Sequence, residues 1–217
     1  MFIGHYAAAF AAKKVDTRPS LGTLFMAAQR LDLLWPFLLL TGYESVTIEK
    51  GNTVFTPLNF IHYPISHSLF AVVGWSLLFG VIYYTLKRNR KGAIVVGVLV
   101  FSHWALDWIT HRPDLPLSPF GNIKTGLGLW NFKYIAVIVE VLLFAIGLYL
   151  YTTATKAKNK MGNWSLWLFV VFLLFIYTMN VFGPVPTSVN QIAKAGLSQW
   201  LLIIWGYWID TTRIAGK

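Results

Sequence analysis

The chain has 217 residues, of which 56% are hydrophobic and only 12% are charged. A soluble domain is usually about 45–50% apolar and about 25% charged, so this composition excludes an ordinary soluble fold and favours an integral membrane protein. The net charge of +10 fits basic loops on the cytoplasmic side of a membrane, so we expect no nucleic-acid partner, and the lack of cysteine excludes disulfides and cysteine-ligated zinc.

The first predicted element is a short helix over residues 1–12, which is too short to cross a membrane alone. No positive segment precedes its run of small residues, so we do not expect a cleaved signal peptide. About 20 apolar residues are needed to cross the hydrocarbon core. Four later segments meet this length cleanly: 68–86, 92–110, 134–152 and 164–182.

Two further segments are weaker candidates for membrane spans. The segment 22–41 is long enough but is interrupted by Gln29, Arg30 and Asp32. The segment 197–209 is short and rich in tryptophan, so we expect it to be tilted or to end at the interface. The sequence therefore predicts an all-α polytopic transmembrane bundle of about five to six spans plus the short N-terminal helix.

Basic loops predict the orientation of this bundle. If the spans alternate, all the basic clusters fall on one side, which the positive-inside rule places in the cytoplasm. We therefore expect a multi-pass membrane protein with its basic loops in the cytoplasm and with one domain over residues 1–217. The basic residues are Lys13, Lys14 and Arg18, then Lys87, Arg88, Arg90 and Lys91, then Lys156, Lys158 and Lys160, and finally Arg213 and Lys217.

Seven ionisable side chains lie in or beside the apolar segments, where a charge is costly and usually serves a function. Counting 1.5 Å per helical residue brings several of them to one depth in the outer half of the membrane. All five histidines of the chain belong to this set, which consists of His5, Asp32, His62, His67, His103, Asp107 and His111.

His103 and Asp107 are four residues apart, so they share one helix face and can grip one cation. Imidazole and carboxylate ligands without sulfur suit zinc, manganese or iron in a hydrolytic site. The simpler alternatives are that single histidines only form hydrogen bonds near the interface and that Asp32 pairs with Arg30. For His62 and His111 a role as loop residues is an equal alternative.

These residues lie in motifs that resemble a known family. The motifs are Gly4-His5, Leu31-Asp32 with Pro36, the segment His-Tyr-Pro-Ile-Ser-His-Ser at 62–68, and the segment His-Trp-Ala-Leu-Asp-Trp-Ile-Thr at 103–110. Their order is similar to that in the predicted membrane-bound metal-dependent hydrolases, a bacterial family also described as LexA-binding and inner membrane-associated. The resemblance covers residues 4–120 and implies a protein of a bacterial inner membrane, with motifs for a metal site in 1–120 and supporting helices in 134–217.

The chain departs from that family at four positions. Leu34 and Trp35 stand where the family has a second aspartate and a histidine, and Tyr63 and Ser66 replace its arginine and threonine. The resemblance therefore implies one or two divalent ions, with the second ion missing or held differently. Zinc is favoured, and manganese, iron or magnesium are alternatives.

The resemblance implies a metal-dependent hydrolase that acts on a lipid or another membrane-resident ester. A weaker analogy with soluble zinc-dependent phospholipases C favours a phosphoester. We expect membrane lipid and a lipid or small-molecule substrate as partners, and Arg112 and Lys124 could hold a phosphate headgroup. The oligomeric state stays open. The expected metal ligands are His5, Asp32, His67, His103 and Asp107.

Three other residues are expected to act in catalysis. His62 could serve as a base, a donor to a ligand or an extra ligand, and His111 could protonate a leaving group. Ser68 is expected to orient His67 or to cap its helix rather than to attack the substrate. Two rival functions use the same residues: a transporter for protons or metal ions, and a scaffold with a structural metal.

Overall fold

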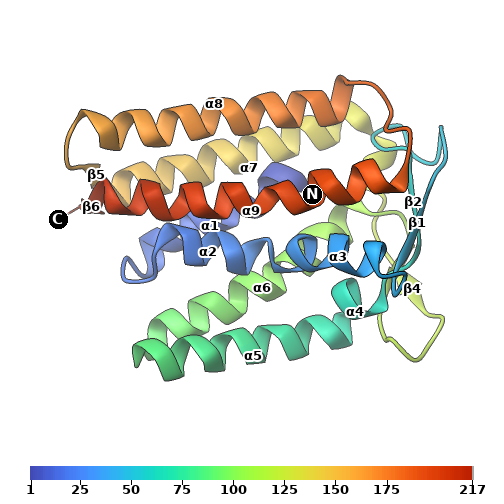
Figure 1. Cartoon of the computed structure of the whole chain (residues 1–217), viewed down its shortest axis with the longest axis horizontal. Helices are drawn as coiled ribbons and strands as arrows, with labels where there is room; N and C mark the ends of the chain where they lie inside the picture. Colours follow the sequence, from blue (N-terminus) through green and yellow to red (C-terminus); the bar gives the residue numbers. More distant parts are fainter. Residues whose placement is uncertain (217) are drawn as a thin grey trace.

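A computed structural model describes residues 1–216 as nine α-helices with three small two-stranded sheets (Figure 1). The prediction of an all-α transmembrane fold is confirmed. A single 3-10 turn at Leu129–Asn131 precedes α7. The helices are α1 (Phe2–Val15), α2 (Leu21–Ala28), α3 (Arg30–Leu40), α4 (Pro64–His67), α5 (Leu69–Lys87), α6 (Arg90–Thr110), α7 (Lys133–Ala154), α8 (Lys160–Phe182) and α9 (Val189–Thr211).

Four helices, α5 to α8, are long and apolar enough to cross a membrane. The pair α2 and α3 meets the same test only when taken together, as one broken span or as a re-entrant loop, and the two helices are bent by 56° where Gln29 interrupts them. The predicted sixth span is part of α9, which is longer than expected and begins at the cap residue Ser188. Its first turns carry Asn190, Gln191 and Lys194. Although α9 is long enough, it is therefore less apolar than α5 to α8 and does not meet the criterion that they meet.

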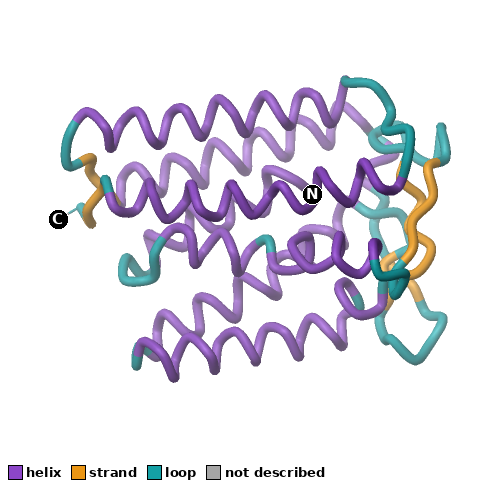
Figure 2. Tube along the Cα trace, viewed as in Figure 1, coloured by secondary structure: helices purple, strands orange, loops and turns teal. Residues whose placement is uncertain are grey.

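The strands lie at the two ends of the bundle (Figure 2). One end carries the antiparallel pairs β1 (Ser45–Ile48) with β2 (Leu58–His62) and β3 (Leu115–Pro116) with β4 (Lys124–Thr125). The opposite end carries the pair β5 (Thr155–Ala157) with β6 (Arg213–Ala215).

The basic clusters lie at the end that carries β5 and β6. Figure 1 shows that the turn between α5 and α6 lies at the same end of the bundle as these two strands. Of the predicted basic residues, Lys217 lies outside the described residues. We call this end the basic end, and the opposite one the hairpin end.

Polar caps begin several of the membrane helices. The side chains of Ser68, Asn89 and Asn159 accept the hydrogen bonds of otherwise free backbone N–H groups at the starts of α5, α6 and α8. In lipid an unpaired backbone donor is costly, so these caps fix where each span begins.

The short helix α1 lies inside the bundle, against α2, α6, α7 and α8. Gly147 of α7 permits this close approach, because a Cβ there would collide with the backbone of Ala7. Around α1 the rings of Tyr6, Phe10 and Phe25 pack edge to face. The apolar core therefore fixes the position of a helix that is too short to span, and with it the position of His5.

Candidate metal centre

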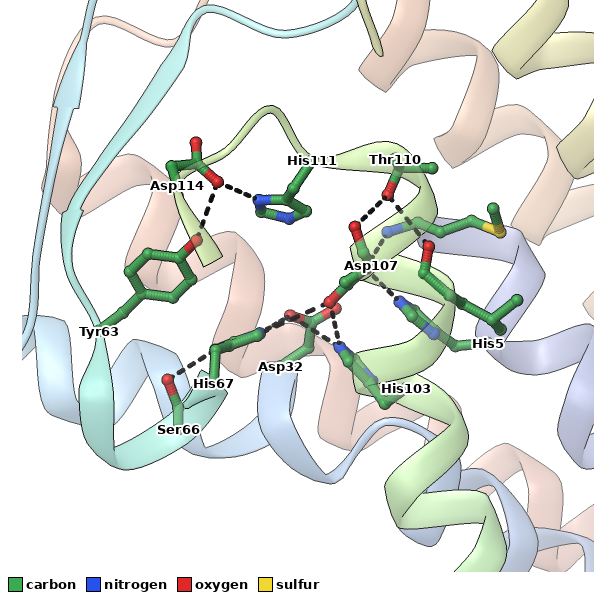
Figure 3. A network of polar contacts seen from close by, with 12 residues as sticks. His5, Asp32, Tyr63, Ser66, His67, His103, Asp107, Thr110, His111 and Asp114 are labelled. Atoms are coloured by element: carbon green, nitrogen blue, oxygen red, sulfur yellow. Dashed lines mark hydrogen bonds and ion pairs between the residues drawn. The ribbon is translucent and has the colours of Figure 1, made fainter. Parts of the chain in front are cut away.

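Five ionisable side chains from four helices meet in one buried cluster. His5 comes from α1, Asp32 from the first turn of α3 and His67 from the end of α4, and one face of α6 supplies His103 and Asp107 (Figure 3). The structure thus brings together all five residues expected as ligands. We call them the His–Asp cluster.

The ring nitrogens face carboxylate oxygens at short range. His103 Nε2 lies 3.1 Å from Asp107 Oδ2, and His5 Nε2 lies 3.2 Å from Asp107 Oδ1. Asp32 Oδ1 lies 3.6 Å from His67 Nε2 and 3.7 Å from His103 Nε2. These contacts form two overlapping groups of three that share His103, so the cluster is one continuous site.

A backbone carbonyl fixes the tautomer of His103. Its Nδ1 lies 2.7 Å from the carbonyl oxygen of Ala28. Because a carbonyl oxygen can only accept, Nδ1 carries the proton and donates it. The neutral ring therefore presents a bare Nε2, with its lone pair, to the carboxylates of the cluster.

The tautomer of His67 is fixed by a hydroxyl and a buried carboxylate. Ser66 Oγ donates its only proton to Glu44 Oε2 at 2.5 Å, so it must accept the contact of 2.6 Å from His67 Nδ1. Glu44 also accepts the backbone N–H groups of Ile65 and Ser66 at 2.8 Å each, which ties α4 to the loop before β1. His67 thus also presents a bare Nε2.

This arrangement fits a divalent cation. The N-terminal ammonium of Met1 offsets the charge of Asp107, but the lone-pair nitrogens and the carboxylate of Asp32 still repel unless a further positive charge lies between them. His103 Nε2 and both ring nitrogens of His5 are buried and have no hydrogen-bond partner. Zinc binds histidine nitrogen at about 2.0–2.1 Å, which places neighbouring ligand atoms of a tetrahedral site about 3.3 Å apart. The distances of 3.1 to 3.9 Å in the cluster span that value.

The cluster has one accessible side. The side chain of Asp32 is 27% exposed, whereas the other four side chains are at most 4% exposed. The N-terminal ammonium of Met1 contacts Asp107 Oδ1, a carboxylate that is itself buried. A groove of about 590 Å³ between α5 and α6 lies elsewhere, since none of its lining residues belongs to the cluster. A ligand would therefore reach the cluster past Asp32.

Two of the three residues expected in catalysis lie away from the cluster. His62 is an exposed residue at the end of β2 and pairs with Ser45 across the hairpin. Ser68 Oγ donates to the Pro64 carbonyl at 2.6 Å and accepts from Ala71 N at 3.2 Å. The geometry of Ser68 is that of a helix cap, and neither residue contacts a cluster side chain.

The third of these residues, His111, belongs to a second buried polar group. Its Nδ1 lies 2.9 Å from Asp114 Oδ1, which also accepts the Tyr63 hydroxyl at 3.0 Å, and Arg112 Nε lies 3.2 Å from Asp114 Oδ2. Burial opposes ionisation of Asp114, but hydrogen bonds from these three residues outweigh it and hold its pKa below the usual value.

Reasoning from sequence missed three residues. Glu44 supports His67 but is more than 20 residues away in the chain, so no local pattern connects them. Glu140 is fully buried in α7 and accepts the backbone N–H of Ile3 at 3.1 Å, which joins α7 to the start of α1. Because Glu140 is an acid inside a predicted span, the sequence alone could have identified it. The third is Asp114, whose carboxylate lies 2.9 Å from His111 Nδ1, and its position three residues after His111 was a local signal.

A family model described as YdjM inner membrane protein matches residues 3–183. The chain belongs to the YdjM family. This family is also known as the LexA-binding, inner membrane-associated predicted hydrolases, so the resemblance drawn from the motifs is confirmed. The match continues beyond the motifs at 4–120 and includes α7 and α8. No curated protein and no solved structure matches the chain significantly.

Proposed function

We propose that the chain is a metal-dependent hydrolase of a lipid or another membrane-resident ester, with a phosphoester as the favoured substrate. Membership in the YdjM family supports hydrolase chemistry in the inner membrane. The observation that carries the proposal is the pair of fixed tautomers, because His67 and His103 both aim a bare Nε2 at Asp32 and Asp107. Such ligands hold a divalent ion, and zinc is our first choice.

The residues of the cluster take separate roles in this proposal. His67, His103 and Asp107 are buried and would hold the ion rigidly, while His5 completes the group from α1. A divalent ion bound there would lower the pKa of a water molecule and polarise the scissile bond. The partly exposed Asp32 borders the accessible side, where it would orient the attacking water and exchange its proton.

Arg30 supports a phosphoester rather than a carboxylic ester. Its guanidinium lies over the rings of Trp75 and Phe79, 4.5 and 5.0 Å from their centroids, and its Nε is buried without a hydrogen-bond partner. Within residues 1–216 no carboxylate pairs with it. A cation inside a membrane span without a protein counter-ion suits an anionic ligand.

Trp75 links Arg30 to the cluster. Its indole N–H donates to the Ile65 carbonyl at 2.9 Å, in the same short helix that carries His67. Arg30 also begins α3, two residues before Asp32. A phosphate held by Arg30 would therefore lie near the first turn of α3, which carries Asp32.

The basic end supports an orientation with that end in the cytoplasm. The cluster uses the last two turns of α6 and so lies nearer the hairpin end. In this orientation the reaction takes place within the outer half of the inner membrane, where lipid itself can reach the site.

The test is hydrolysis by the purified protein in lipid nanodiscs. We expect bound divalent metal by elemental analysis and release of product from a phospholipid, with less from a carboxylic ester of the same chain length. His103→Ala should lose both metal and hydrolysis. Cleavage of the carboxylic ester alone would overturn the phosphoester preference.

The same preparation separates the two rival functions. Uptake of metal or protons into proteoliposomes without hydrolysis would replace the enzyme by a transporter. Bound metal without hydrolysis or uptake would indicate a scaffold, whose site should have all ligand positions filled by protein. The exposure of Asp32 argues for an open position instead.

A further inference from the structure

A second histidine–carboxylate pair lies one helical turn beyond Asp107. His111 follows the end of α6, and its backbone N–H still bonds to the Asp107 carbonyl at 2.8 Å. Both His111 and Asp114 are buried, at 3% and 5% exposure. His111 is thus held next to the His–Asp cluster, although neither it nor Asp114 belongs to the two groups of potential metal ligands.

The hydrogen bonds of Asp114 fix how the ring of His111 is protonated. The carboxylate can only accept, so His111 Nδ1 carries a proton and donates it to Asp114 Oδ1. His111 Nε2 makes no hydrogen bond within the described residues. The atom is also not fully buried. This nitrogen is therefore open to a ligand.

The open nitrogen lies on the side of the cluster. Figure 3 shows the ring of His111 between Asp114 and the cluster residues. The ring of Tyr63 packs against both His67 and His111, with centroid distances of 5.3 and 6.3 Å. On its other faces His111 contacts Phe60 and Trp130, which limit its rotation.

We propose that His111 donates a proton to the leaving group and that Asp114 is the residue that positions it. This proposal rests on the proposed hydrolase function. In this proposal a phosphoester bound at the His–Asp cluster has its leaving group on the side of His111. A protonated imidazole also needs a negative neighbour, and Asp114 provides one on the far side of the ring.

The step balances with water as the only co-reactant. The oxygen of water forms a bond to phosphorus, and the bond from phosphorus to the leaving oxygen breaks with its electron pair on that oxygen. The leaving oxygen takes the proton from His111 Nε2 and departs as an alcohol. Asp32 takes the proton that the attacking water loses and releases it to solvent, and His111 takes up one proton from solvent, so the enzyme is unchanged after one turnover.

The test compares two phosphodiesters that differ in their need for this proton. Didodecyl phosphate has an alkoxide leaving group, whereas dodecyl p-nitrophenyl phosphate releases a stable phenolate. For His111→Gln and Asp114→Asn we expect hydrolysis of the first to fall by roughly 10²- to 10⁴-fold, the usual contribution of general acid catalysis, and hydrolysis of the second to fall far less. Thr178→Val is the control and should change neither rate, because the Thr178 hydroxyl bonds only to the Leu174 carbonyl of its own helix α8.

Equal losses on both substrates with the metal retained would overturn the role in proton donation. Loss of metal from His111→Gln would also overturn it, because His111 would then be a ligand. If His111→Gln or Asp114→Asn does not fold, Tyr63→Phe serves instead, since it removes only one hydrogen bond to Asp114 and should slow the alkyl substrate alone. A wild-type protein that binds metal and cleaves neither ester would refute the proposed function itself. This outcome differs from failure of the proposal on His111, which is judged only from the variants of an active wild type.

Discussion

The imidazole rings of His5 and His103 are stacked, with centroids 3.6 Å apart and planes within 6° of each other. Two cationic rings at this separation would repel strongly in a buried site. The stack therefore suits two neutral imidazoles, the form that binds a metal. It also means that α1 contributes to the cluster through direct contact with α6, although α1 is too short to cross the membrane.

Removal of one ring of this stack should remove the metal. We expect His103→Ala to reduce the divalent metal content of the purified protein to background, because His103 is the residue shared by both ligand groups. A chelator should lower the melting temperature of the wild type toward that of His103→Ala, since a ligand that binds the folded state stabilises it. His62→Ala is the control and should keep its metal. An unchanged metal content in His103→Ala would place the metal elsewhere.

The support of His67 by Ser66 should be measurable as metal affinity. Ser66→Ala removes the hydroxyl that accepts His67 Nδ1–H, so the ring loses its fixed tautomer and Glu44 loses a donor. We expect metal binding to weaken by roughly 10- to 100-fold, as is typical when the partner of a ligating histidine is lost. Titration with a competing chelator measures this change.

Ser102→Ala is the matched control for that experiment. Ser102 precedes His103 in α6, and its Oγ donates to the Leu99 carbonyl of the same helix. This side chain makes no hydrogen bond to an expected metal ligand. It should leave the metal affinity unchanged. An equal loss in both variants would show that the effect of Ser66→Ala is a general loosening of the bundle.

The close approach of α1 and α7 gives a third prediction. In Gly147→Ala the new methyl group meets the backbone of Ala7, which cannot move without displacing α1 and His5. Overpacking of this kind usually costs about 1–3 kcal/mol, so both thermal stability and metal content should fall. Gly74→Ala in α5 is the control, because its methyl group meets nothing within 4 Å, and it should retain stability and metal. Equal behaviour of the two variants would contradict this packing argument.

The fold could be predicted from sequence where one span carried one continuous signal. Segment 164–182 carries no charged residue and segment 134–152 carries only Glu140, and α7 and α8 extend these segments by only a few residues. The start of α9 was missed because Asn190 and Lys194 are polar, although Ser188 was available as a cap. The bend between α2 and α3 was visible only as an interruption of the apolar run, since its angle depends on packing against other helices.

The site was predictable to the extent that its contacts are local or that depth constrains them. The spacing of four residues predicts the shared face of His103 and Asp107 directly. The partners from other helices depended on depth and on the family motifs. The groups that fix the tautomers, a carbonyl at Ala28 and a carboxylate at Glu44, have no pattern in the sequence, because any residue has a carbonyl and any distant acid can fold back.

The pH dependence of stability should show a contribution from Asp16, which joins the end of α1 to the start of α6. Its carboxylate accepts three hydrogen bonds from Arg18, at 3.0 to 3.1 Å, and one from Asn89 Nδ2 at 3.1 Å. Burial opposes ionisation of Asp16, but these bonds outweigh it and lower its pKa to about 2.

A lowered pKa means that the folded state favours the ionised form. The stabilisation by Asp16 is therefore complete above its ordinary pKa of about 3.9 and is lost as the pH falls toward 2. At pH 7 we expect Asp16→Asn to lower the melting temperature by roughly 2–4 °C, the shift that about 1 kcal/mol gives in a chain of this size. The difference from wild type should shrink between about pH 4 and pH 2. Arg18→Gln removes the other partner and should show the same pH dependence, whereas a difference that stays constant down to pH 2 would mean that the charge of Asp16 contributes nothing to stability.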